Sequence, residues 1–113
     1  MKIDLEGKKF VSTSNTENGE VNSETVFEYH QKGELVWADY SGGEIIKGHL
    51  IGRFENGKLN MKYHHLNQNN ELMAGECISI PELLDDGRLK FTESWQWYTG
   101  DKSAGESEIV EVI

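Results

Sequence analysis

The stretch IIKGHLIGRFENGKLNMKYHHL, residues 45–66, contains an Asn-Gly dipeptide between two runs of alternating polarity. Asn and Gly tolerate the positive φ angles of a two-residue hairpin turn, so Asn56-Gly57 predicts a tight turn between two antiparallel strands. Such a turn also determines which residues face each other across the strands. On one face the expected pairs are Phe54 with Leu59, Gly52 with Met61, Leu50 with Tyr63 and Gly48 with His65. This face is predicted to be the interior, because glycines opposite bulky partners suit the inner wall of a narrow barrel.

Glycine and asparagine mark turns along the rest of the chain in the same way. The turn signals are Asn18-Gly19, Lys32-Gly33, Gly42-Gly43, Asn56-Gly57, Asn69-Asn70, Asp86-Gly87 and Gly100-Asp101. They separate eight segments whose polarity alternates with a period of two, and no segment keeps a helical period. The sequence therefore predicts an all-β protein, a single eight-stranded antiparallel up-and-down β-barrel, with at most one short helical turn near residues 81–86.

The inner face can be extended to the neighbouring strands from their turns. A turn at Lys32-Gly33 is expected to align Tyr29 with Val36 and Phe27 with Ala38, and a three-residue loop at 41–43 to set Ala38 beside Ile46. Further inward positions follow from the alternation. They are Phe10, Ser12, Ser14, Tyr40, Met73, Gly75, Cys77, Ser79, Leu89, Phe91, Glu93, Trp95, Trp97, Ser107 and Ile109.

Many of these inward side chains are polar, which is unusual for a filled barrel. Buried polar groups must find partners or stay hydrated, so several of them in one lumen indicate a wet pocket. The candidate ligand-binding residues are Ser12, Tyr29, Tyr40, Tyr63, His65, Glu93, Trp95 and Trp97. The indoles would wall the ligand and the other side chains would supply hydrogen bonds; packing of the indoles and internal hydrogen bonds of Glu93 are the structural alternatives. If Glu93 is desolvated, its pKa should rise.

Composition restricts the class of function. The 113 residues, with 36% hydrophobic and 27% charged, predict one globular domain over residues 1–113. The formal net charge of -9 argues against nucleic acid and anionic membranes as partners. The start, MKIDLEGKKF, carries acids where a signal peptide would be apolar, so we expect a cytoplasmic protein. Its single cysteine, Cys77, is predicted to be a buried thiol.

Two other classes of function stay open at this point. In the first, Glu93 and His65 form the acid and base pair of an enzyme acting on a small metabolite. In the second, the barrel is filled and serves as an interaction module or homo-oligomer, with an outer interface around Trp37, Ile45 and Ile51. No cofactor or metal site is expected, because His64 and His65 point to opposite faces and the cross-strand pair His49 and His64 lacks a third ligand.

Three stretches carry a family resemblance: FEYHQKGELVWADYSGG (27–43), NMKYHHLNQNNELMAGEC (60–77) and ESWQWYTGDKSAGESEI (93–109). They resemble a group of short, poorly characterised bacterial proteins, often labelled acetylglutamate synthase, and the resemblance implies a small avidin-like or lipocalin-like barrel. It brings no assigned catalytic residues. The usual acetyltransferase needs an α/β fold and a backbone loop for the pyrophosphate of acetyl-CoA, and this sequence predicts neither. Fold similarity thus implies a cavity and leaves its content open.

Overall fold

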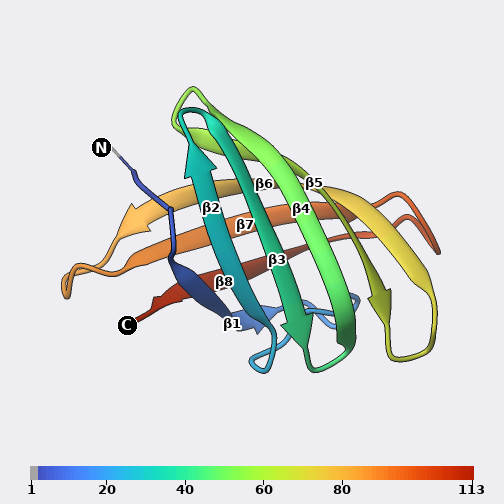
Figure 1. The fold of residues 1–113 in the computed structure, drawn as a ribbon. Coiled ribbons are helices and arrows are strands. Elements are labelled where there is room, and N and C mark those ends of the chain that lie inside the picture. Colours follow the sequence, from blue (N-terminus) through green and yellow to red (C-terminus); the bar gives the residue numbers. More distant parts are fainter. Residues whose placement is uncertain (1–2) are drawn as a thin grey trace.

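The computed structural model describes residues 3–113, which form a closed barrel of eight antiparallel strands. The strands are β1 (Lys9–Asn15), β2 (Val26–Lys32), β3 (Leu35–Gly42), β4 (Ile45–Glu55), β5 (Lys58–Asn67), β6 (Leu72–Leu83), β7 (Leu89–Trp97) and β8 (Ala104–Val112). Each strand pairs with the next, and β8 pairs with β1 to close the sheet. In Figure 1, β2 to β5 slope steeply across the view whereas β6 to β8 run nearly level, as expected when a twisted sheet closes on itself. The predicted up-and-down barrel is confirmed.

The hairpin between β4 and β5 has the predicted register. Asn56 and Gly57 have φ angles of 52° and 77°, the left-handed values that the turn requires. The inward and outward pairs were both predicted correctly, from Phe54 opposite Leu59 to His49 opposite His64. At Gly48, an added Cβ would lie 2.4 Å from the Tyr40 ring, so close packing inside the barrel requires glycine there.

The predicted registers of the two preceding hairpins are wrong. The turn after β2 is centred on Gly33-Glu34, so Tyr29 lies opposite Ala38, Phe27 opposite Tyr40 and Gln31 opposite Val36. The next turn is at Gly43-Glu44, and Ala38 lies opposite Leu50. The first error is a slip of two residues, which leaves every side chain on its predicted face because the side-chain period is also two.

Two irregularities in strand pairing reverse the expected orientation of single residues. A shift between Ile45 and Lys47 buries Ile45 and leaves Ile46 47% exposed. Ile45 therefore belongs to the core and not to the predicted outer interface, whereas Trp37 is half-buried and Ile51 exposed on the outer face. A shift between Ser12 and Ser14 exposes Ser14, which was expected inside.

Two connections also differ from the prediction. No helical turn forms near residues 81–86: Pro81 to Leu83 continue β6 opposite Phe91 to Leu89, and the chain turns after Leu84. The signal at Asn18-Gly19 is not a tight hairpin but part of a longer connection, residues 16–25, which we call the β1–β2 loop. No helix among residues 3–113 is long and apolar enough to cross a membrane.

The two ends of the barrel are closed differently. At the end where β2 finishes, the N-terminal segment packs across the opening: Leu5 is fully buried, and its backbone N–H donates to Gln31 Oε1 at 2.8 Å. The opposite end carries the β1–β2 loop together with the turns after β3, β5 and β7. The candidate site lies at this second end, beneath the β1–β2 loop.

Candidate functional site

The lumen is divided into a packed half and a half with free space. In the packed half, the ring of Phe10 lies 5.1 Å from that of Tyr29 and 5.4 Å from that of Phe91, measured between centroids. All three side chains are fully buried. This half has the edge-to-face and tilted contacts that aromatic side chains adopt in cores, and it stabilises the barrel.

The other half contains a cavity of about 50 Å³ beneath the β1–β2 loop. A space of this size holds the equivalent of roughly four water molecules. Its walls come from all eight strands and the loop. The lining residues are Asn15, Gly19, Glu20, Val21, Phe27, Tyr40, Leu50, Met61, Tyr63, His65, Cys77, Glu93, Trp95, Trp97 and Ser107.

Glu93, on the inner face of β7, is the buried acid of this cavity. Its carboxylate accepts hydrogen bonds from the Ser79 hydroxyl at 2.6 Å and the Ser107 hydroxyl at 3.3 Å. Both serines lie directly opposite Glu93 on the neighbouring strands. Burial raises the pKa of Glu93, and the two hydroxyls oppose that effect. Internal hydrogen bonds of Glu93 were the structural alternative to ligand contact, and two serines supply them.

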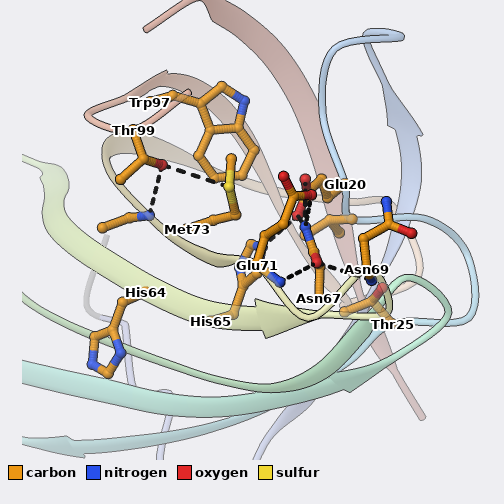
Figure 2. Close-up of polar contacts among 12 residues, drawn as sticks. Glu20, Thr25, His64, His65, Asn67, Asn69, Glu71, Met73, Trp97 and Thr99 are labelled. Atoms are coloured by element: carbon orange, nitrogen blue, oxygen red, sulfur yellow. Dashed lines mark hydrogen bonds and ion pairs between the residues drawn. The ribbon is translucent and has the colours of Figure 1, made fainter. Parts of the chain in front are cut away.

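A second polar group joins the barrel wall to the loop. The Tyr40 hydroxyl lies 2.9 Å from His65 Nδ1. On the other side of the ring, Glu20 Oε1 lies 2.8 Å from His65 Nε2 (Figure 2). Since Glu20 can only accept when ionised, Nε2 carries the proton and Nδ1 accepts from Tyr40. Burial lowers the pKa of His65, and Glu20 opposes that effect. The side-chain amide of Asn67 donates to both oxygens of Glu20. Together with the His65 contact, three hydrogen bonds thus hold the Glu20 carboxylate of the loop.

The two indoles are positioned by the same loop region. Trp95 Nε1 donates to Asn15 Oδ1 at 3.2 Å, and Trp97 Nε1 donates to the backbone oxygen of Asn18 at 3.1 Å. The ring centroids are 5.6 Å apart in an edge-to-face arrangement. Because both N–H groups are bonded to the protein, the indoles present carbon faces and edges to the cavity.

A family comparison agrees with this architecture. Residues 3–112 match the family model described as Avidin-like protein. The chain belongs to the Avidin-like family. No curated protein and no solved structure matches it. The avidin-like barrel is consistent with the binding of a small molecule in the lumen, and it confirms the avidin-like resemblance of the sequence.

Six of the eight predicted site residues line the cavity of this avidin-like barrel: Tyr40, Tyr63, His65, Glu93, Trp95 and Trp97. The other two do not. Ser12 is buried and donates to the backbone oxygen of Ser14 at 3.2 Å, and Tyr29 lies in the packed half. Their assignment as ligand contacts does not agree with this geometry.

Sequence reasoning missed the residues that the loop contributes, above all Glu20, and also Asn15 at the end of β1. Asn15 faces the lumen because the irregularity at Ser12 and Ser14 changes the alternation. Glu20 lies outside any strand, so period-two reasoning could not assign it a face. The only sequence signal for Glu20 was its place beside the Asn18-Gly19 turn signal. Without a strand register, that place did not show whether the side chain faces the lumen.

Cys77 and His49, the other residues considered for chemistry, have structural roles. Burial raises the pKa of Cys77, whose thiol lies 3.7 Å from the Ser79 hydroxyl; as predicted, it is a small buried thiol. His49 pairs with Asp39 on the outer face, 3.0 Å from Nδ1 to Oδ1. Within residues 3–113, no group of three His, Cys, Asp or Glu side chains is placed to hold a metal ion.

Proposed function

We propose that this protein binds a small organic molecule inside the barrel, in the cavity beneath the β1–β2 loop. The observation that carries the proposal is the mixed lining of that cavity: indole and phenol rings form its walls, and the carboxyl group of Glu93 lies among them. Ligand sites have this composition, mostly apolar with a few placed polar groups. We further propose a cytoplasmic location, in keeping with the single, unpaired Cys77.

The size of the cavity limits the ligand. Space for roughly four waters accommodates a molecule, or a group projecting from a larger one, of about four or five non-hydrogen atoms. With at most about 1.5 kcal/mol per atom, such a group contributes no more than about 7 kcal/mol, a dissociation constant near 10 μM or weaker. The binding assay must therefore detect weak complexes.

Neither alternative function is favoured by the geometry. An acid and base pair would need a free atom on each partner near a common substrate, but both nitrogens of His65 are bonded, to Tyr40 and Glu20. No hydrogen bond joins His65 and Glu93 among those of the described residues. The cavity of about 50 Å³ in the lumen supports a binding site more than the filled barrel of an interaction module.

Tryptophan fluorescence tests the proposal. Trp37 stacks on His30 outside the lumen, with the ring centroids 5.5 Å apart, and a Trp37→Phe background leaves Trp95 and Trp97 as the only indoles. A saturable change on titration with small polar and aromatic compounds is expected, and its loss in a Glu93→Gln, Trp95→Ala variant. The matched control is Glu76→Gln on the exposed face of β6, which should keep the response. A response that survives in the double variant would contradict the assigned site.

A further inference from the structure

The cavity has an unbalanced charge. Glu20 and Glu93 both line it, and none of its fifteen lining residues is lysine or arginine. His65, the only basic side chain among these lining residues, uses one nitrogen on Tyr40 and the other on Glu20, and burial lowers its pKa, which disfavours the charged form. A buried carboxylate is normally paired with a cation, and within the described residues no side chain supplies one to Glu93.

The hydrogen bonds of Glu93 leave it able to take a further partner. Ser79 and Ser107 each supply one hydroxyl, whereas a carboxylate offers about four acceptor positions. The Ser79 hydroxyl lies 3.7 Å from the Cys77 thiol, which is a weak donor. If the thiol donates to the Ser79 oxygen, the hydroxyl proton of Ser79 stays available to Glu93. These donors suit the ionised form of Glu93, and only partly replace the water lost on burial.

Aromatic rings surround the same space. Trp97 lies 5.6 Å from both Trp95 and Tyr63, measured between ring centroids, and Tyr40 and Phe27 complete the wall, stacked 4.9 Å apart. The face of an aromatic ring is electronegative and attracts cations, most strongly in tryptophan. The buried carboxyl group and the aromatic ring faces thus both favour a positively charged ligand. The formal net charge of -9 adds a long-range attraction for cations.

We infer that the ligand of this cavity is a compact organic cation, such as an amidinium or small alkylammonium group, whose charge meets Glu93 while its carbon atoms lie against Trp95 and Trp97. This inference rests on the proposed function, which requires only that some small molecule binds. It adds the sign of the charge, which the barrel architecture alone does not specify. It also explains why the cavity contains no lysine or arginine.

Three probes of nearly the same planar shape test the sign of charge: acetamidinium, acetamide and acetate. Each is titrated into the ¹⁵N-labelled wild-type protein, and the indole N–H resonances of Trp95 and Trp97 report occupancy. Acetamidinium is expected to bind at least about tenfold more tightly than acetamide, the factor that one additional charge-assisted contact of about 1.4 kcal/mol provides. Acetate is expected to leave these two resonances unchanged.

Variants then assign the preference to Glu93. Glu93→Gln should reduce the ratio of acetamidinium to acetamide affinity to about one, whereas Glu76→Gln, which makes the same change in net charge on the outer face, should preserve it. Equal or tighter binding of acetamide in the wild-type protein would overturn the inference and leave the proposed function intact. Failure of all three probes to shift the lumen resonances at concentrations up to about 100 mM, about 10⁴ times the tightest dissociation constant expected for so few atoms, would overturn both.

Discussion

Replacing Tyr29 by phenylalanine is expected to stabilise this protein. The Tyr29 side chain is fully buried, and its hydroxyl is the one buried side-chain polar atom without a hydrogen-bond partner among residues 3–113. Burial raises the pKa of this phenol well above its usual value, with a further contribution from the charge of Glu93. The ring itself contacts Phe10 and Phe91, and phenylalanine keeps these contacts.

The magnitude follows from two opposing effects. Burying an unpaired polar group costs about 1–3 kcal/mol, and the substitution removes this cost. The missing oxygen leaves a void on the order of 10–20 Å³, which at about 24 cal/mol per Å³ costs about 0.2–0.5 kcal/mol. We therefore expect the free energy of unfolding to rise by about 0.5–3 kcal/mol, and Tm to rise by about 4 °C for each kcal/mol.

Urea denaturation, followed by tryptophan fluorescence and far-UV circular dichroism, measures the change. Tyr40→Phe is the matched control with the opposite sign, because it removes the hydroxyl that donates to His65 Nδ1 and leaves that buried nitrogen unpaired. The control should lose about 1–3 kcal/mol of unfolding free energy. A satisfied hydrogen bond usually contributes about 1 kcal/mol to stability. Destabilisation of the Tyr29→Phe variant by about that amount or more would therefore refute the reasoning, since the hydroxyl would then have a partner.

Three other substitutions test the site. Because the pKa of Glu93 is raised in the folded protein, the stability linked to its protonated form is complete below the unfolded pKa and lost as pH rises through the folded pKa. In urea titrations at several pH values, the unfolding free energy of Glu93→Gln relative to the wild type should therefore increase with pH. A difference that does not vary with pH would contradict the shift. Glu20→Gln removes an interaction that raises the pKa of His65, so an NMR titration of the His65 ring should show a still lower pKa, and an unchanged value would mean that the loop contact does not form in solution. Gly48→Ala places a Cβ within 2.4 Å of the Tyr40 ring and should destabilise the barrel by about 1–3 kcal/mol in thermal unfolding, whereas a neutral effect would show that the inner wall is not closely packed there.

The strand order and the inward faces could be predicted because both depend on local chemistry. Turn residues with positive φ and a side-chain period of two act over a few neighbouring residues, so Asn56-Gly57 gave a correct register for its hairpin. The same logic placed Glu93, Trp95 and Trp97 in the lumen together. The predicted register between β2 and β3 was wrong by two residues, but the inward residues were still assigned correctly because the alternation repeats every two residues.

The composition of the site depended on contacts between distant parts of the chain. Glu20 meets His65 and Asn67 only because β8 pairs with β1 and brings the β1–β2 loop over one end of the barrel. The irregular pairing that exposes Ser14 and turns Asn15 inward likewise depends on β8 and not on residues 9–15 alone. Alternation assigns a face only within a regular strand, so loops and bulges acquire their positions from the closed barrel. Local sequence therefore specified the walls of the cavity and the Glu93 carboxyl group among them, and closure of the sheet specified the cover and its carboxyl group, Glu20.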